Sequence, residues 1–474
     1  MSIKVTRSDV VWNYIGMFMS LGGNFLLLPF LIYYLEGDLL GLWYVFLSIG
    51  SIVTLLDFGF NPTFARNIAY SWSGAKELSK DGVVFAEENE PNFNLLKKVI
   101  VTSKKIYLVL SLTALLLLLT IGSAYIFRVS STIVGNRHIV AWYIYCIAVF
   151  LNIYYGYYST FLRGVGAIKQ LNIALVISRG SQIIVSILLL YSGFGIVGVA
   201  IAYVLYGFGY RLICKKLFYR FNNIGDKLKF SEAIISTKEI KEIFIKVWHN
   251  AWKDGLVSLS RYLGNQATVI IVSMYFTLTE TGIYSISLQI ITAIATISSV
   301  LYSTFQPALQ SAYINNKQSE SRYMMSISMT TYNILFWLGI MAFIIVGIPI
   351  LTYIKPGMAF NIPILLGISL YEYLLKNHYL YASYISNTNH IPYVNSFVIS
   401  SIVGVTLSYI AVGVLGYGIW GLILTQLVVQ SVYNNWIWPY KVMKSLNLNF
   451  ISMTKIGVKG ISAQLNKKFK INHT

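Results

Sequence analysis

Long apolar stretches separated by short polar breaks run along almost the whole chain. A helix of about 20 apolar residues is long enough to cross the hydrocarbon core of a bilayer. The breaks are rich in charged residues, Gly, Pro or Asn, which commonly end helices. The pattern predicts twelve membrane-spanning helices, at residues 11–35, 39–66, 104–127, 139–163, 171–192, 196–213, 247–276, 281–310, 323–349, 362–386, 393–414 and 418–440.

The composition agrees with a membrane protein rather than a soluble enzyme. Of the 474 residues 56% are hydrophobic and only 11% are charged, whereas soluble domains carry about 25% charged residues. The two cysteines, Cys146 and Cys214, give neither a disulfide framework nor the spacing of a metal site. Lys4 and Arg7 precede the first apolar run without a small-residue cleavage site, which predicts a retained first helix. The fold class expected is an all-α polytopic membrane protein.

The distribution of basic residues predicts the orientation of the spans. The chain has 36 Lys and Arg against 17 Asp and Glu, a net charge of +19. If both termini are cytoplasmic, only Arg128, Arg137 and Lys355 fall on the opposite side, as the positive-inside rule requires. The excess of Lys and Arg over Asp and Glu would also attract anionic membrane lipid or an anionic substrate.

An internal repeat divides the chain into two halves. At an offset of 223 residues, the turn Gly193–Gly198 matches the turn Gly416–Gly421. Six spans in each half make the repeat parallel, and transporters built from repeats bind substrate between the halves. The domains expected are an N-terminal six-helix bundle at 1–213, a basic cytoplasmic linker at 214–246, a C-terminal six-helix bundle at 247–440, and a basic cytoplasmic tail at 441–474.

Ionisable residues inside the spans are the candidates for function, because a charge in the bilayer is costly and normally faces a bundle interior or a wet cavity. The stretch Val247–Phe276 is the clearest case. It carries Lys253 and a stripe on one helix face formed by Asp254, Ser258, Arg261 and Asn265. The first span, 11–35, carries no charge, so the charged groups should be concentrated in the C-terminal half.

These residues suggest two roles. Guanidinium groups match phosphate oxygens well, so the candidates for substrate binding are Arg261, Lys253, Arg179, Asn265, Arg66 and Arg163. The candidates for ion coupling are Asp57, Glu372, Asp254 and Lys376. The structural alternatives are internal ion pairs for Arg261 and Arg179, snorkelling at helix ends for Arg66 and Arg163, and a structural i, i+4 pair for Glu372 with Lys376. The lone His249 and His378 are more typical of structural residues.

Several activities lack their sequence signals. There is no GxxxxGK[ST] loop for an ATP-binding module, no G-x-S-x-G and no HExxH. The predicted outer loops are too short for the site of a membrane polysaccharide polymerase or ligase. We therefore expect no cofactor, no metal site and no nucleic-acid partner, with transport driven by an ion gradient or the membrane potential.

Sparse positions along the chain carry a family resemblance. They are Asn13–Gly16, Asn24–Phe30, Gly41–Trp43, Leu56–Phe60 and the turn Gly193–Gly198. In these positions and in its twelve predicted spans, the chain resembles the bacterial polysaccharide repeat-unit flippases (Wzx-type translocases of O-antigen or capsule). These belong to the multidrug/oligosaccharidyl-lipid/polysaccharide exporter (MOP) superfamily.

The resemblance implies two bundles around a cationic cavity that opens alternately to the two sides of the bacterial cytoplasmic (inner) membrane. The implied substrate is an oligosaccharide on undecaprenyl diphosphate, and the polymerase and chain-length machinery are implied candidate partners. Lipid II flippases of the superfamily have arginines in the first span, whereas this chain has none between Arg7 and Arg66. Two alternatives stay open: a small-molecule cation or drug exporter of the same fold, and a membrane polysaccharide polymerase or ligase.

Overall fold

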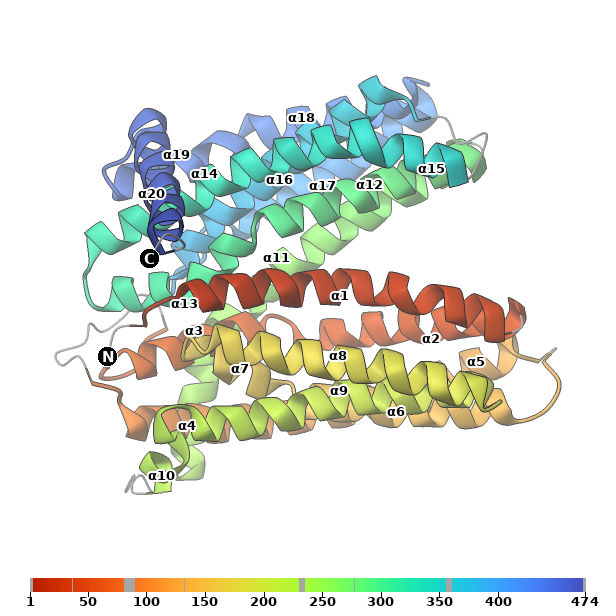
Figure 1. The fold of residues 1–474 in the computed structure, drawn as a ribbon, viewed down its shortest axis with the longest axis horizontal. Coiled ribbons are helices and arrows are strands. Elements are labelled where there is room, and N and C mark those ends of the chain that lie inside the picture. The colour runs from red at the N-terminus through yellow and green to blue at the C-terminus, as the bar shows by residue number, and fades with distance from the viewer. Residues whose placement is uncertain are drawn as a thin grey trace. The chain divides into compact units, whose positions relative to one another are not determined.

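The computed structural model describes residues 3–35, 37–80, 90–131, 133–229, 235–276, 278–354 and 360–471, and every regular element in these ranges is a helix (Figure 1). A few side chains inside helices, including those of residues 261–267, lie outside the described part. The chain divides into two compact units, Met1–Gly255 and Leu256–Thr474.

The first unit is built on the packing of four long helices: α1 packs on α8, and α9 packs on both α8 and α6. Asp9 joins the starts of α1 and α8, since it caps α1 together with Thr6 and accepts a hydrogen bond from the Lys169 backbone N–H. The helices are α1 Arg7–Tyr34, α2 Gly37–Thr54, α3 Phe60–Trp72, α4 Phe93–Leu117, α5 Ser123–Val129, α6 Arg137–Tyr154, α7 Tyr157–Gly164, α8 Ile168–Tyr191, α9 Gly195–Arg220, α10 Ile224–Lys229 and the first part of α11 Thr237–Tyr275.

In its described residues the second unit contains the rest of α11 and nine further α-helices. They are α12 Leu278–Ser298, α13 Val300–Ile314, α14 Gln318–Ala342, α15 Ile348–Ile354, α16 Ile362–Ser386, α17 Val394–Tyr409, α18 Gly418–Val432, α19 Asn434–Ser445 and α20 Phe450–Ile471. Most of the predicted basic tail is thus helix α20, which packs on α14. Gly457 and Gly460 allow this close approach, because a methyl group at either position would overlap a side chain of α14.

The two halves share irregularities as well as helices. The second predicted span is broken in each half: between α2 and α3 at Phe58 and Gly59, which have positive φ, and between α12 and α13 by a 43° bend. The third predicted span contains a π-helical turn in each half, at Leu118–Gly122 and at Phe343–Gly347. Such turns are rare and often lie at functional sites.

Seven helical segments in the described ranges are long and apolar enough to cross a membrane, or eight if the bent pair α12–α13 is one span. The protein is therefore a multi-pass membrane protein. The number twelve stays a prediction; α18, for example, ends after 15 residues at the break before Asn434. The seven are Arg7–Leu31, Phe93–Val129, Arg137–Gly164, Ile168–Tyr191, Gly195–Lys229, Gln318–Tyr353 and Val394–Val414.

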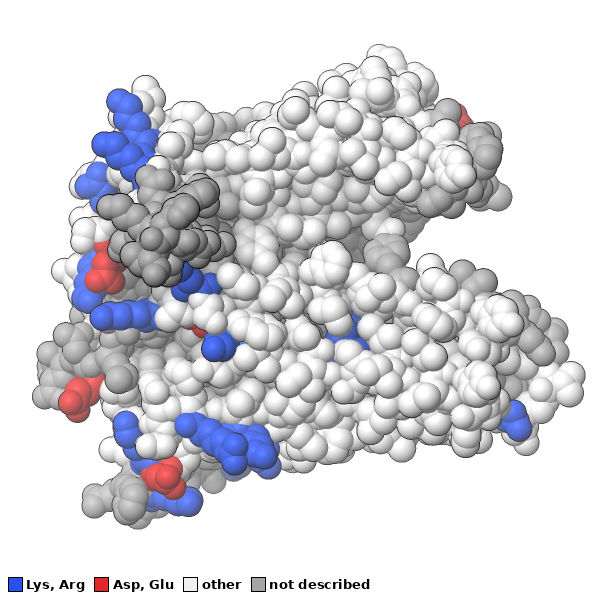
Figure 2. Space-filling view, viewed as in Figure 1, with Lys and Arg blue, Asp and Glu red and all other residues white. Residues whose placement is uncertain are grey.

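Basic residues gather at one end of each unit. Figure 2 shows them in the first unit around the start of α4 and around α10, and in the second unit around α19, while the sides of the helices are almost free of charge on the face shown. This arrangement suits helices whose sides lie in lipid and whose basic ends lie at a membrane surface.

Helix α11 begins at Thr237, earlier than the predicted Val247, because apolar length reveals only the membrane part of a helix. Ser236 and Glu239 form a reciprocal cap at its start. Three contacts then hold this polar start to the first unit: Lys98 Nζ to Glu239 Oε1 (2.6 Å), Lys246 Nζ to Glu77 Oε2 (3.5 Å) and Asn250 Nδ2 to the Lys80 carbonyl (2.8 Å).

The break before α3 packs tightly on α11. Gly59 has φ of 80°, and a methyl group there would overlap the Ala251 carbonyl oxygen. Gly59→Ala should therefore lower the free energy of unfolding by at least about 2 kcal/mol, from backbone strain plus overpacking. Gly135→Ala is the matched control, since Gly135 has φ of 88° but open space around it. Equal unfolding free energies for the two variants in detergent would contradict this packing.

The Lys98–Glu239 pair should make stability depend on pH. The Lys98 ammonium holds the pKa of the Glu239 carboxyl below its usual value. The contribution of this ion pair to the stability of the fold is then complete above the ordinary Glu pKa of about 4.3. It is lost as the pH falls through the lowered pKa of Glu239. Glu239→Gln should lower the melting temperature at pH 7 and match the wild type near pH 3. If the melting temperature of Glu239→Gln is still below that of the wild type at pH 3, the ion pair is not the cause of the difference.

Candidate functional site

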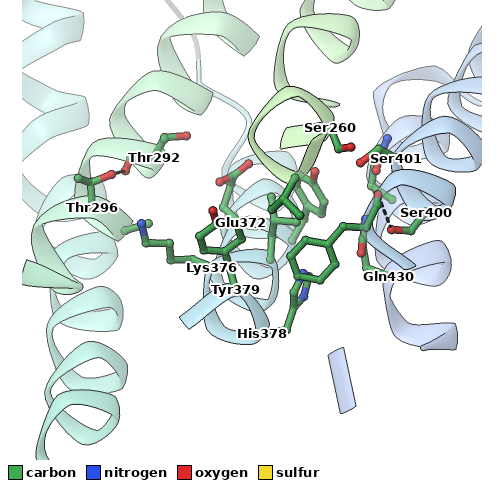
Figure 3. Close-up of a pocket in the computed structure, with 16 residues that line it drawn as sticks. Ser260, Thr292, Thr296, Glu372, Lys376, His378, Tyr379, Ser400, Ser401 and Gln430 are labelled. Atoms are coloured by element: carbon green, nitrogen blue, oxygen red, sulfur yellow. Dashed lines mark hydrogen bonds between the residues drawn. The ribbon is translucent and has the colours of Figure 1, made fainter. Parts of the chain in front are cut away.

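The second unit encloses a cavity of about 360 Å³, which is within the size range of small-molecule sites (Figure 3). Its walls come from α11, α12, α16, α17 and α18, and most of the side chains are polar or aromatic. Ser260 comes from α11, and Thr292 and Thr296 come from α12. The cavity thus unites short polar side chains that are far apart in sequence.

Helix α16 supplies the two charged side chains of the described lining, Glu372 and Lys376, one helical turn apart. In Figure 3 Lys376 extends toward Thr296, while Glu372 lies near the middle of the site. Glu372 is buried and only 4% exposed. The described lining therefore has one acid and one base, so its described side chains carry no excess of either charge.

His378 lines the same cavity but has a firm structural partner. Its Nδ1 lies 2.7 Å from Asn435 Oδ1, and its ring packs edge-on against Phe397 at 5.2 Å between centroids. These contacts agree with the structural interpretation of this histidine. They also tie the lining of α16 to the first turn of α19.

The α17–α18 side of the cavity is organised by an amide network that the sequence analysis did not identify. Asn434 Nδ2 donates to Gln430 Oε1 (2.9 Å) and to Ser400 Oγ (2.8 Å), and Asn434 Oδ1 accepts from the Trp438 indole (3.0 Å). Gln426, one turn before Gln430, donates to Ser408 Oγ (3.2 Å). The sequence did contain a signal for this network. Gln426, Gln430 and Asn434 are spaced by four residues in an apolar segment, which places their amides on one helix face.

A second polar cluster lies inside the first unit, where α3 packs on α11. Arg66 Nη2 contacts Asp254 Oδ2 at 3.1 Å, and Thr63 Oγ1 donates to the same oxygen at 3.0 Å. Arg66 is only 2% exposed, so the snorkelling interpretation of this residue is wrong. Beside the pair, Lys253 Nζ lies 3.0 Å from His249 Nε2.

Two other predicted site residues of the first unit, Asp57 and Arg179, have hydrogen-bond partners outside this cluster. Asp57 accepts hydrogen bonds from the Tyr107 hydroxyl (2.6 Å) and the Asn61 backbone (3.1 Å), which closes the break before α3. Arg179 is buried, donates to Gln182 Oε1 and lies over the Tyr206 ring at 4.7 Å.

Three further predicted site residues belong to α7 and α11. Arg163 is exposed in the last turn of α7, as expected of a helix-end arginine. The side chains of Arg261 and Asn265 lie outside the described part, although both positions belong to α11. The structure thus brings Arg66, Asp254 and Lys253 together in the first unit, and Glu372 with Lys376 in the second. The functional roles assigned to all these residues stay predictions.

Comparisons with known proteins identify the fold. No family model matches the sequence, and no curated protein matches it. A crystal structure described as MATE in the bent conformation matches with a TM-score of 0.67 and 16% identity, over 94% of this chain and 99% of that one. A multidrug resistance MATE family transporter of the MOP superfamily in its outward-facing conformation matches with a TM-score of 0.67 and 14% identity. The match covers 94% of this chain and 99% of that one.

A MOP superfamily transporter from Pyrococcus furiosus, described as having a binding pocket of reverse polarity that suggests a different function, has a TM-score of 0.65 and 14% identity, over 94% of this chain and 100% of its own. At these identities the likeness concerns the fold alone. This chain has the fold of the MATE transporters of the MOP superfamily over nearly its whole length.

The buried pair of the first unit can be tested by a double-mutant cycle. Arg66→Met or Asp254→Leu alone should lower the free energy of unfolding by about 3–5 kcal/mol, because each leaves a charge buried without its partner. The double variant should recover most of that loss. We expect this in denaturant titrations of the detergent-solubilised protein; additive losses would mean that the two side chains do not interact.

Proposed function

We propose that this protein is a flippase that moves undecaprenyl-diphosphate-linked oligosaccharide repeat units across the bacterial cytoplasmic membrane by alternating access. The product would serve the assembly of a surface polysaccharide, O-antigen or capsule. The observation that carries the proposal is the chemistry of the second unit's cavity, where hydroxyl, amide and aromatic side chains surround one acid and one base. In this proposal the twelve spans form two six-helix bundles, and both termini are cytoplasmic.

The fold is compatible with this substrate and with others. A multidrug resistance transporter and a transporter with a pocket of reverse polarity both share it with this chain. The fold therefore supports transport as the class of activity, rather than enzymatic catalysis. The choice of substrate must rest on the side chains that this chain places in its interior.

The main rival is a small-molecule cation or drug exporter, which the likeness to a multidrug resistance transporter favours. Such an exporter needs acidic groups to attract its substrate. Here Asp254 is neutralised by Arg66, and Glu372 shares its cavity with Lys376. With a net charge of +19 as well, the chain suits an anionic lipid-linked substrate better than a cation. A polymerase or ligase is disfavoured by the fold.

Each predicted residue has a role in the proposal. The diphosphate would bind Arg261 and Lys253, with Asn265, Arg179, Arg66 and Arg163 as further substrate-binding candidates, because guanidinium forks match phosphate oxygens. Asp57, Glu372, Asp254 and Lys376 are the candidates for coupling to an ion gradient, without a cofactor. Anionic lipid would contact the basic ends of the helices, and the polymerase and chain-length machinery would receive the product.

The proposal predicts a specific loss of function in cells. In the organism that encodes this chain, a strain without the gene should lack the surface polysaccharide, and the wild-type gene should restore it. Arg261→Ala should reduce the surface polysaccharide about 10- to 100-fold, since a charge-assisted hydrogen bond contributes about 1.5–3 kcal/mol. Arg137→Ala, an exposed arginine that donates only to the Gly193 carbonyl among the described groups, should restore it fully.

Drug susceptibility distinguishes the rival in the same strains. Under the proposal, deletion or overexpression should leave the inhibitory concentrations of lipophilic cations unchanged. A resistance that follows the level of the protein, together with normal polysaccharide in the deletion strain, would overturn the flippase assignment in favour of the exporter. Protein levels of both arginine variants should be measured in the membrane fraction, so that loss of function is not confused with loss of protein.

A further inference from the structure

We propose that the cavity inside the second unit binds one uncharged sugar ring of the substrate, that Gln430 recognises the ring, and that Asn434 positions Gln430. The identity of the cargo rests on the proposed function. The class of ligand, a polyhydroxylated ring, rests on the chemistry of the cavity alone.

Three hydroxyl groups of the lining are arranged to accept hydrogen bonds. Ser260, Thr296 and Ser400 each donate their hydroxyl proton to a backbone carbonyl of their own helix, at 2.7, 2.8 and 3.2 Å. Because those protons are already used, the oxygens offer lone pairs to a ligand. Together with the Glu372 carboxyl, they favour a ligand that carries several O–H donors.

The amide of Gln430 supplies a complementary donor. Its carbonyl oxygen accepts from Asn434 Nδ2 at 2.9 Å, which fixes the orientation of the amide. No described residue accepts a hydrogen bond from the Gln430 amide nitrogen, and Gln430 lies in the wall of the cavity (Figure 3). This nitrogen can therefore donate to a hydroxyl oxygen of the ligand.

Asn434 holds this orientation because the helix breaks in front of it. Tyr433, between α18 and α19, has φ −141° and ψ −58°, outside the helical region. Asn434 is buried at 1% exposure, and it connects Gln430, Ser400 and Trp438 in one network. It does not line the cavity itself, so we assign it a positioning role.

Aromatic rings complete the site. Tyr371, Tyr379 and Phe397 line the cavity, and the electron-rich faces of such rings attract the slightly positive C–H groups of a sugar. The apolar surface of these rings also favours the burial of the C–H face of a sugar, because burial removes that face from water. A sugar presents both features, C–H faces and O–H edges, that this lining matches.

The same lining disfavours two other ligand classes. Phosphate only accepts hydrogen bonds when fully ionised. Here the Glu372 carboxyl offsets its attraction to Lys376, and the hydroxyl oxygens of Ser260, Thr296 and Ser400 are also oriented to accept. A lipophilic cation has no O–H groups for those oxygens, and Lys376 lies one turn from the acid that would attract it. The chemistry of the cavity thus points to an uncharged polyol.

The test is ligand binding to the purified full-length protein in a detergent without a sugar headgroup, such as lauryldimethylamine oxide. The probes are methyl β-D-glucopyranoside, N-acetylglucosamine, inorganic phosphate and tetraphenylphosphonium, each titrated while tryptophan fluorescence is recorded. At least one of the two sugars should bind, with no competition from phosphate or the cation. Gln430→Ala should weaken that binding about tenfold, the effect of one hydrogen bond in a buried site.

The matched control is Thr425→Ala. Thr425 is also on α18, but it is absent from the cavity lining and donates to the Gly421 carbonyl. This variant should bind sugar as the wild type does. If Gln430→Ala does not fold, Ser401→Ala removes a lining hydroxyl at small structural cost and should also weaken binding.

The positioning role of Asn434 predicts non-additive effects. Asn434→Ala should weaken sugar binding in the wild type but cause little further loss when Gln430 is already Ala. A merely structural role would lower the melting temperature by the same amount in both backgrounds and weaken binding additively. Additive losses would overturn the positioning role.

The outcomes separate this inference from the proposed function. Sugar binding that is absent in the wild type, unchanged in Gln430→Ala, or displaced by tetraphenylphosphonium would overturn the sugar site. If lipid-linked oligosaccharide is still transported in that case, the flippase function stands without the site. Gln430-dependent sugar binding without any transport of lipid-linked oligosaccharide would support the site and overturn the function.

Discussion

The constraint on which this structure depends is that a polar group in the bilayer must find its partner within the protein, because the hydrocarbon supplies none. The first unit meets it with separate polar clusters. Arg66, Thr63 and Asp254 satisfy one another between α3 and α11, and Asp57 is held by Tyr107 and the start of α3. These contacts fasten a broken span to a neighbour at the position where Gly59 permits close packing. The Arg66–Asp254 contact there joins α3 to α11.

The second unit gathers polar side chains around a cavity. Around its cavity, Ser, Thr and Gln side chains use one hydrogen-bonding group on their own helix or on Asn434 and leave another for a ligand. A ligand with matching donors and acceptors would form hydrogen bonds with these remaining groups, whereas a simple ion would not. This oriented set of groups around a cavity is the physical basis for assigning recognition of the sugar ring to the second unit.

The helical, membrane-spanning character of the chain could be predicted from sequence, because apolar length and the position of Lys and Arg are local properties. Arg66 and Asp254 stood out as costly intramembrane charges, but their pairing joins residues 188 positions apart and follows only from packing. The break at Phe58 and Gly59 was missed because the apolar pattern runs through it. The cavity was missed for a similar reason, since five helices contribute to it and its key amides, Gln430 and Asn434, are uncharged.

The central claim is that this fold moves a lipid-linked oligosaccharide and that the second unit recognises the sugar. The most direct measurement is transbilayer movement of an undecaprenyl-diphosphate-linked oligosaccharide in proteoliposomes that contain the purified protein, followed by the access of an external sugar-modifying enzyme to the lipid. The account predicts movement that needs the protein and is slowed about tenfold by Gln430→Ala, the effect of one hydrogen bond. Movement no faster than in protein-free liposomes, together with uptake of a lipophilic cation, would contradict it.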